Sequence, residues 1–377
     1  MQNINNLLAV KTPAYIIDEA AIINNCKILK GIKDATGCKI LLASKAFSSY
    51  CMFNTIKEYL DGMTSSSLHE ARLSYEEMHS ETHIFSPGYR DDEFDEICTY
   101  SDHIVFNSFN QWNHFKATAL SHNISCGLRI NPEYSEVEVD LYNPCAKGSR
   151  LGITFDNFND QDLTGIEGLH FHCLCEQGAD VLVRTLEAVE TKFGPYLTNL
   201  KWLNFGGGHH ITRQNYDLTL LISTINRIKN TYNLQVYLEP GEAVALNAGF
   251  LVSSVLDITT NSINNAILDT SAATHMPDVL EMPYRPNVIN AKEANILDYT
   301  YRFGGPTCLS GDIIGDYSFN KPLEIGDKVI FEDMAIYTMV KNNTFNGINL
   351  PSIYILKEDS KLELHKSFNY NDFKTRL

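Results

Sequence analysis

Eight short apolar runs, each ending in small or polar residues, recur along this chain with segments of helical length between most of them. They cover residues 39–45, 63–67, 83–88, 103–108, 124–130, 166–173, 202–208 and 235–241. Strands that alternate with helices form parallel sheets, and eight such units predict a closed (β/α)₈ barrel of the TIM type. A doubly wound open sheet is the alternative, but no GxGxxG motif follows the first run.

The pattern changes after Glu242, where turn residues replace the helical segments between strand-like runs. We therefore predict two domains. The barrel covers residues 14–242, and a mainly β domain, sandwich-like or barrel-like, covers residues 243–377 together with 1–13. A long insertion follows the fifth run at residues 131–165, and in a barrel it belongs to the face where loops build the active site.

Composition limits the partners of this chain. With 30 basic and 46 acidic residues its formal net charge is −16, which argues against nucleic acid and favours cationic ligands, although solubility alone explains such a charge. Nine scattered cysteines without a CxxC pair indicate reduced thiols. Neither a signal peptide nor an apolar stretch of membrane length is recognised, so we expect a cytoplasmic protein that binds neither membrane nor nucleic acid.

Catalytic side chains of such a barrel follow the carboxyl ends of its strands. Lys45 ends an otherwise apolar run, where desolvation favours the neutral amine, a nucleophile for carbonyl groups; a lysine that merely extends to solvent is the alternative. Gly206, Gly207 and Gly208 follow the seventh run, near the usual phosphate site of this fold. Their N–H groups are expected to be open to an anion, unless the glycines only make a tight turn.

Further polar side chains follow the sixth and eighth runs. Glu239 is placed to bond a protonated pyridine nitrogen, or else to cap a local turn. His172 is able to stack on a flat cofactor, although a single histidine there is more often structural. His170 shares its predicted strand face, but no third ligand is apparent, so we predict no metal site.

The predicted β domain contains the motif GGPTCLSGD, with Cys308 and Asp312. A thiol delivers protons to carbanions, and a carboxylate binds amines. A cysteine that only fills space in a core is the alternative.

Taken together, the chain resembles the alanine-racemase-like (fold type III) decarboxylases that use pyridoxal phosphate (PLP), a family that includes ornithine, arginine and diaminopimelate decarboxylases. The resemblance runs over nearly the whole length, and the order and spacing of its anchors are more specific than any single anchor. The anchors are Lys45, Ser67 with Glu70, Phe171–His172, the glycines at 206–208, EPG at 239–241, GPTC at 305–308 and Tyr337.

The resemblance implies that Lys45 holds PLP covalently, that His172 stacks on its ring and that Glu239 pairs with its pyridine nitrogen. It further implies that Cys308 returns a proton to the product from the partner subunit of a homodimer with shared active sites. The other implied cofactor-binding residues are Ser67, Gly206, Gly207, Gly208, Gly241 and Tyr337.

Two departures from the family pattern narrow the range of possible substrates. Glu242 stands where an EPGR motif has a phosphate-binding arginine, and Leu309 follows the cysteine where an acidic residue is common. With these changes and the motifs HFHCLCE, HMPDVLEMPYRP and FEDMAIYTMVKNNTFNG, the chain resembles the carboxynorspermidine/carboxyspermidine decarboxylases, which form norspermidine or spermidine in polyamine biosynthesis. Glu242 and Asp278 then become candidates for binding the cationic amines of the substrate, with Asp312 as a third.

Other functions stay open at this point. A decarboxylase of the same fold for diaminopimelate or a basic amino acid is the first, and a racemase the second, although a racemase would carry an arginine where Glu239 stands. A non-catalytic PLP-binding protein is the third, although such proteins are typically a barrel alone. A metal-dependent barrel hydrolase is the most distant.

Overall fold

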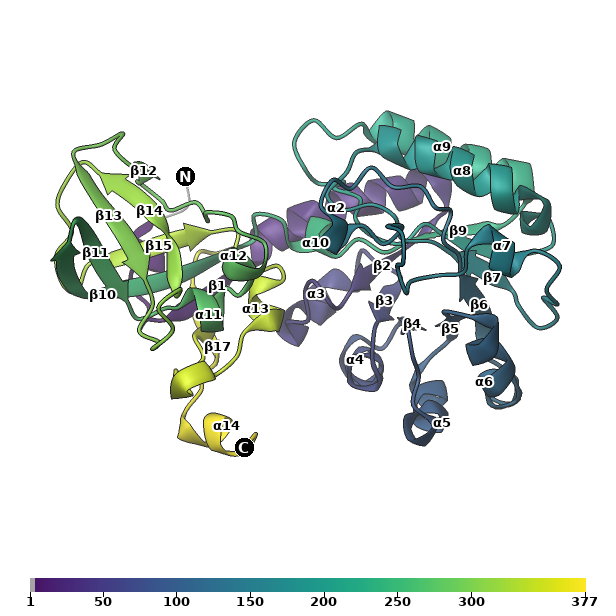
Figure 1. Ribbon diagram of the computed structural model, residues 1–377, viewed down its shortest axis with the longest axis horizontal. Helices are drawn as coiled ribbons and strands as arrows, with labels where there is room; N and C mark the ends of the chain where they lie inside the picture. The colour runs from purple at the N-terminus through teal and green to yellow at the C-terminus, as the bar shows by residue number, and fades with distance from the viewer. Residues whose placement is uncertain (1–3) are drawn as a thin grey trace. The chain divides into compact units, whose positions relative to one another are not determined.

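The computed structural model describes residues 4–377, and it divides them into two compact units. One unit covers Ile23–Val244. The other unit consists of two chain segments, one that runs up to Ile22 and one from Ala245 to Leu377. In the described part of the chain, no helix is both long enough and apolar enough to cross a bilayer. Each unit is described by itself (Figure 1).

The unit Ile23–Val244 is built on a closed barrel of eight parallel strands that neighbour one another in chain order (Figure 1). The barrel closes where β2 pairs with β9, with Lys39 opposite Tyr237. Each of the eight apolar runs overlaps one of these strands, so the predicted (β/α)₈ barrel is confirmed. The strands are β2 (Lys39–Ala43), β3 (Gly62–Ser65), β4 (Glu81–Phe85), β5 (His103–Phe106), β6 (Ser125–Arg129), β7 (Gly168–His170), β8 (Trp202–Asn204) and β9 (Gln235–Leu238).

Helices surround the strands because each carries one apolar stripe. In α9 the Asp217 side chain caps the first turn by accepting the Leu220 N–H at 2.9 Å, and the buried residues recur at helical spacing along one face. Figure 1 shows α8 and α9 side by side on the outside of the barrel. The helices are α2 (Glu19–Thr36), α3 (Phe53–Ile56), α4 (Leu68–Leu73), α5 (Asp91–Tyr100), α6 (Phe109–Ser121), α7 (Phe155–Phe158), α8 (Ala179–Leu197), α9 (Leu218–Tyr232) and α10 (Glu242–Ala245).

Side chains fill the inside of the barrel. A buried cluster of Leu41, Val105, Trp202 and Tyr237 forms one part of this core. The Trp202 indole fits there because the neighbouring strands carry glycines: a Cβ at Gly127 or Gly168 would lie 2.1 Å or 1.9 Å from the ring. The interior is therefore packed core, which leaves the strand ends as places for a site.

The other unit is an open sheet of nine strands in the order β12-β14-β13-β11-β10-β1-β16-β17, with β15 paired to β10. Short helices α1 (Ile4–Leu7), α11 (Ala272–His275), α12 (Asp278–Glu281), α13 (Thr338–Lys341) and α14 (Tyr370–Lys374) accompany it. The strands are β1 (Ala14–Asp18), β10 (Gly249–Asn261), β11 (Ile263–Leu268), β12 (Lys292–Glu293), β13 (Tyr299–Gly304), β14 (Ile313–Phe319), β15 (Lys328–Glu332), β16 (Ser352–Leu356) and β17 (Leu362–Lys366).

The division of the chain differs from the predicted boundary at residue 14. Strand β1 pairs antiparallel with β10 and parallel with β16, and all five of its residues are buried. It is thus an inner strand of the open sheet, whereas the barrel begins with β2. At the second boundary the units divide after Val244, close to the predicted residue 242.

Candidate active site

Lys45 lies at the end of the barrel where the carboxyl ends of all eight strands meet. Glu70 connects the end of β2, which Lys45 follows, to the end of β3. A single Glu70 carboxylate oxygen accepts hydrogen bonds from the Ser44 hydroxyl and the Ser66 N–H, both at 2.7 Å. Ser67, a predicted cofactor-binding residue, caps α4 by accepting the Glu70 N–H at 3.4 Å. These bonds fix the backbone on both sides of the barrel mouth near Lys45.

The amine of Lys45 is tuned toward its neutral form. Desolvation within the barrel mouth lowers its pKa, and the positive charge of Arg129 lowers it further, while Glu239 opposes both. Because the side chain still reaches solvent, water screens part of this effect. A lysine of this kind is a better nucleophile at neutral pH than an ordinary surface lysine.

Glu239 is a buried carboxylate that two side chains hold in place. The His170 Nε2–H donates to one oxygen at 3.1 Å, and the Asn204 amide donates to the other at 2.7 Å. Burial alone would raise the pKa of Glu239, but the interactions with His170, His83 and Asn204 lower it to about 2. Burial lowers the pKa of His170 as well, although the Glu239 carboxylate opposes this shift. The result is a fixed, ionised carboxylate with lone pairs left for a cationic partner.

His172 is oriented by the glycine loop after β8. Its Nδ1 accepts the Gly207 N–H at 2.9 Å, which leaves the ring proton on Nε2. Burial, with the charges of Lys45 and Arg129, holds the pKa of His172 well below its ordinary value. The neutral ring is only partly covered, so one flat surface of this side chain is available at the barrel mouth.

The three glycines after β8 lie against other backbone segments. A Cβ would lie 2.4 Å from the Phe171 carbonyl at Gly206, 2.5 Å from the Glu239 carbonyl at Gly207 and 1.9 Å from the Leu174 carbonyl at Gly208. The prediction that all three N–H groups are open to an anion needs correction. The amides of Gly206 and Gly207 already donate to Asn204 and His172.

Gly241 and Glu242 complete the barrel part of the predicted site. A Cβ at Gly241 would come within 2.6 Å of the Ala46 Cβ, so the chain after Glu239 runs directly against the segment after Lys45. Glu242 begins α10 and lies 3.5 Å from His210 Nε2. At this position the protein therefore carries a carboxylate in contact with an imidazole, and not an arginine.

The remaining predicted residues belong to the sheet unit. Cys308 is exposed, and its N–H donates to the Asn346 side chain at 2.8 Å. Asp312 is buried, with Oδ2 accepting the hydroxyls of Thr307 at 2.6 Å and Ser271 at 2.8 Å, and Oδ1 accepting a backbone N–H. Its carboxylate is thus occupied in holding the loop that carries Cys308, and we no longer count it as a substrate ligand.

Asp278 and Tyr337 also lie in this unit. Asp278 begins α12 and forms an ion pair with Lys341, which contacts Glu281 as well. Tyr337 precedes α13 with a positive φ of 43°, a backbone conformation that is strained for a residue with a side chain. Lys45, Ser67, His172, the four glycines, Glu239 and Glu242 share the barrel unit, whereas Cys308, Asp312, Asp278 and Tyr337 share the sheet unit.

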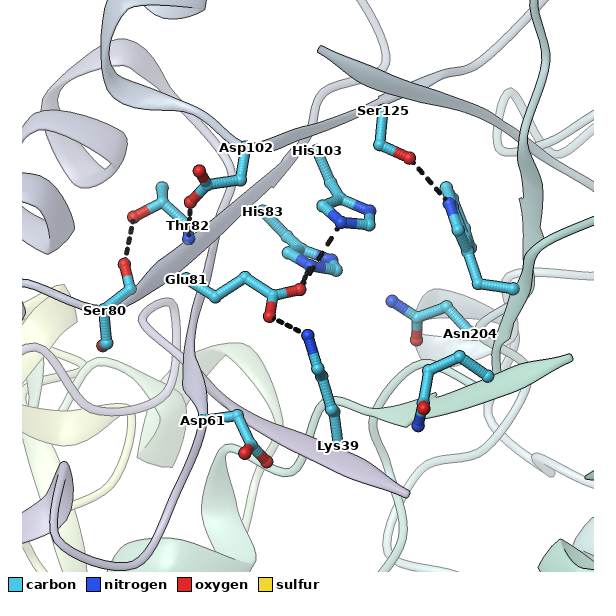
Figure 2. Close-up of polar contacts among 12 residues, drawn as sticks. Lys39, Asp61, Ser80, Glu81, Thr82, His83, Asp102, His103, Ser125 and Asn204 are labelled. Carbon is cyan, nitrogen blue, oxygen red and sulfur yellow. Dashed lines mark hydrogen bonds and ion pairs between the residues drawn. The ribbon is translucent and has the colours of Figure 1, made fainter. Parts of the chain in front are cut away.

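Histidines that suggest a metal site occur elsewhere in the barrel. His170 and His172 are each engaged by another group, whereas a cluster of Glu81, His83 and His103 lies at the opposite, amino-terminal ends of the strands. Figure 2 shows the Glu81 carboxylate between Lys39 and the two imidazole rings, with His83 Nε2 at 2.8 Å and His103 Nε2 at 3.4 Å.

The arrangement of the two rings does not suit a shared metal ion. Their centroids are 4.0 Å apart and their planes differ by 11°. A metal binds about 2.0–2.1 Å from an imidazole nitrogen and in the plane of the ring, and two parallel rings at this separation share no such point. We therefore assign the cluster to joining β2, β4 and β5 at the closed end of the barrel.

Three contributors to the site were not assigned these roles from the sequence. Arg129 is buried 4.6 Å from the Phe85 ring centroid and donates to the His172 carbonyl at 3.3 Å. His170 and Asn204 hold Glu239. The available signal was position, since each lies within one of the eight runs and is the last residue of its strand.

Comparisons with known proteins show the family of the chain. Residues 14–335 match the family model described as "Pyridoxal-dependent decarboxylase, C-terminal sheet domain". The chain is 44% identical to carboxynorspermidine/carboxyspermidine decarboxylase of Campylobacter jejuni, over 97% of this chain and 98% of that protein. It is 42% identical to carboxyaminopropylagmatine decarboxylase of Synechocystis, over 98% and 96%.

The fold has a close counterpart among solved structures. The crystal structure of carboxynorspermidine decarboxylase from Campylobacter jejuni complexed with norspermidine superposes with a TM-score of 0.92 at 43% identity, covering 98% of this chain and all of that chain (100%). The barrel and the sheet unit are thus parts of one known architecture. The chain belongs to the pyridoxal-dependent decarboxylases.

Proposed function

We propose that this chain binds PLP through Lys45 and removes the carboxylate of a carboxylated polyamine, with carboxynorspermidine and carboxyspermidine as its substrates. The observation that supports this most strongly is the buried Glu239 carboxylate, which His170 and Asn204 hold close enough to Lys45 to shift its pKa. An ionised carboxylate opposite a nucleophilic lysine suits a cofactor with an aldehyde and a basic ring nitrogen.

The chemistry of the donor set fits PLP. Lys45 supplies an amine with a lowered pKa, Glu239 an acceptor for a pyridine N–H, and His172 an oriented aromatic face. Of the three glycines in this loop, Gly208 is the one whose N–H is not bonded to Asn204 or His172, so we assign its N–H to an anion. With Glu242 in place of an arginine, we propose that Gly208, Gly241, Ser67 and Tyr337 carry the phosphate contacts.

Bound PLP supplies an electron-withdrawing ring that takes up the electron pair left at Cα when CO₂ departs. Glu239 keeps the ring nitrogen protonated, and His170 and Asn204 prevent its carboxylate from turning away. Lys45 would hold the cofactor through its amine before the substrate binds and after the product leaves. The Cys308 thiol, reaching the site from the partner subunit, returns the proton to Cα.

The substrate assignment follows from the relatives and from charge. Two relatives at 44% and 36% identity carry the name carboxynorspermidine/carboxyspermidine decarboxylase. Glu242, and Asp278 after release from Lys341, would bind the cationic amines of such a substrate. The Synechocystis relative is named for carboxyaminopropylagmatine, so a substrate that ends in a guanidinium group is the second candidate.

The test is to load the purified protein with PLP and measure CO₂ release from carboxynorspermidine, carboxyspermidine, carboxyaminopropylagmatine and diaminopimelate. We expect turnover of the first two above the others. Turnover of diaminopimelate alone would refute the substrate assignment. Borohydride reduction and peptide mapping test the cofactor separately: PLP should be found on Lys45 and be absent from Lys45→Ala.

The proposed homodimer has its own test. Lys45→Ala and Cys308→Ala are each expected to lose activity, and mixing them after reversible dissociation should restore part of it. Restoration is expected because one of the two sites in a mixed dimer then receives a complete set of residues. Mixtures that stay as inactive as the separate variants, although mixed dimers are present, would refute a shared site.

A further inference from the structure

Cys145 and Cys173 bring two sulfur atoms into contact beside the candidate active site. Their Sγ atoms are 3.5 Å apart, although the residues are 28 positions apart in the chain. Cys145 lies in the insertion of residues 131–165, and Cys173 directly follows His172. All nine cysteines are free thiols, and among residues 4–377 this is the one recorded sulfur–sulfur hydrogen bond.

Backbone contacts hold both cysteines in this arrangement. The Cys145 N–H donates to the Asn143 side chain at 2.9 Å. The Ser135 hydroxyl donates to the Cys173 carbonyl at 2.7 Å. Because Ser135 and Cys145 both belong to the insertion, the insertion meets Cys173 at two points, its carbonyl and its sulfur.

The two thiols differ in exposure and in acidity. Cys173 is 1% exposed, whereas Cys145 is only partly buried. Burial raises the pKa of the Cys173 thiol well above its ordinary value. The hydrogen bond with Cys173 lowers the pKa of Cys145, with help from the backbone of Tyr134 and the charge of Arg129. A reachable, more acidic thiol beside a buried one is the arrangement of a redox-sensitive cysteine and its resolving partner.

We propose that Cys145 and Cys173 form a redox-sensitive pair, which a peroxide converts into a disulfide that ties the insertion to the chain after β7. The Cys145 thiolate attacks one peroxide oxygen, and the O–O bond breaks. Hydroxide departs, and Cys145 becomes a sulfenic acid. The Cys173 sulfur then attacks the Cys145 sulfur, the S–S bond forms, and the sulfenic oxygen leaves as water. In sum, two thiols and hydrogen peroxide give one disulfide and two waters, and a dithiol reductant reverses the change.

The disulfide would disturb the proposed cofactor site. An S–S bond is about 2.05 Å long, so the sulfurs must approach by roughly 1.5 Å from their separation of 3.5 Å. Cys173 adjoins His172, whose ring and carbonyl are bonded to Gly207 and Arg129. Misplacement of about 1 Å at a catalytic site costs up to roughly 100-fold in rate. If the proposed function holds, oxidation should lower the rate of CO₂ release at least tenfold.

The experiment begins with the fully reduced, PLP-loaded protein and hydrogen peroxide in small excess. Free thiols are then alkylated, and the digested protein is analysed by mass spectrometry. We expect two thiols to be lost and one linked peptide pair to contain Cys145 and Cys173. Both changes should reverse with dithiothreitol, and CO₂ release should recover in parallel.

Variants separate this pair from its neighbour. Cys145→Ser and Cys173→Ala should each abolish the linked peptide, whereas Cys175→Ser, two residues from Cys173, should keep it. Cys145→Ser changes a partly exposed side chain and keeps the test valid if Cys173→Ala does not fold. The proposal is overturned if no linked peptide forms, if the link involves Cys175, or if the fully linked protein keeps its rate. A linked peptide in a protein that releases no CO₂ from any tested substrate would instead contradict the proposed function.

Discussion

Replacement of Glu239 by glutamine tests the proposed cofactor site most directly. The carboxylate accepts one hydrogen bond on each oxygen, from His170 and from Asn204. Glutamine keeps the shape of the side chain but removes the charge. It also turns one acceptor oxygen into an NH₂ donor, which then faces the donor group of either His170 or Asn204. The variant therefore loses the ionised group opposite Lys45 while the volume of the core is preserved.

The structure gives the size of this effect. The pKa of Glu239 falls from its ordinary 4.5 to about 2, and since one pKa unit is about 1.36 kcal/mol, the fold favours the carboxylate by roughly 3 kcal/mol. A hydrogen bond to a charged group is worth about 1.5–3 kcal/mol. Its loss from a protonated ring nitrogen predicts a fall in kcat of roughly 10- to 150-fold.

The same change should alter stability in a defined pH range. Because the folded pKa is lower than the unfolded one, the carboxylate contributes stability above about pH 4.5, and this contribution is lost as the pH falls toward 2. We expect Glu239→Gln to unfold at lower urea concentration at pH 7, by about 1–3 kcal/mol. The difference from the wild type should shrink toward acid pH.

Glu81→Gln is the matched control, since it makes the same substitution at the opposite end of the same barrel. It breaks the contacts with Lys39 and His83, so we expect a comparable loss of stability with kcat unchanged. Rates of CO₂ release at saturating PLP and substrate, together with urea unfolding, give both quantities. If the kcat of Glu239→Gln equals that of Glu81→Gln, the assignment of Glu239 to the cofactor is refuted.

Two further predictions concern the glycine loop and the sheet unit. Gly208→Ala places a Cβ 1.9 Å from a carbonyl oxygen at a φ of +80°, which costs about 1–3 kcal/mol of strain. A titration should therefore show PLP binding weakened roughly tenfold or more. Gly31→Ala, where a Cβ meets nothing within 4 Å on α2, should leave PLP binding unchanged. Burial lowers the pKa of His275 to about 4. Between pH 6.5 and 4 the unfolded state therefore binds more protons at this residue than the folded state does. The contribution of His275 to the free energy of unfolding should fall by about 1.4 kcal/mol for each pH unit as the pH drops through that range. In His275→Gln the pH dependence of stability from urea unfolding should be weaker by this amount, and an unchanged pH dependence would contradict the reasoning.

The barrel was predictable because its signal is local and repeated. Each apolar run reports one buried parallel strand, and eight of them leave few alternative folds. The segment Ala14–Ile17 gives the same local signal, but its partners β10 and β16 lie more than 200 residues away in the chain. Sequence patterns carry no information on such pairing, so the strand was placed in the wrong unit.

Side-chain contacts at the strand ends limited the prediction of the site. His170 and His172 were expected on one strand face, but β7 ends at His170, and alternation no longer applies beyond it. The bond of Gly207 to His172 arises only when the segments after β7 and β8 meet. Residue types at the strand ends were thus readable from the sequence, whereas the partners that orient them were not.

Glu242 shows how one charge affects cofactor and substrate in opposite ways. Its side chain is 20% exposed and lies 3.5 Å from His210, whose pKa burial lowers. Near the cofactor phosphate this charge is repulsive, and near an amine it is attractive, by about 1 kcal/mol for such a partly exposed group. Glu242→Gln should therefore tighten PLP binding and raise KM for carboxynorspermidine, each by roughly fivefold. The exposed Glu58→Gln should change neither. If Glu242→Gln strengthens the binding of both PLP and substrate, or weakens the binding of both, Glu242 does not act on the two in opposite ways.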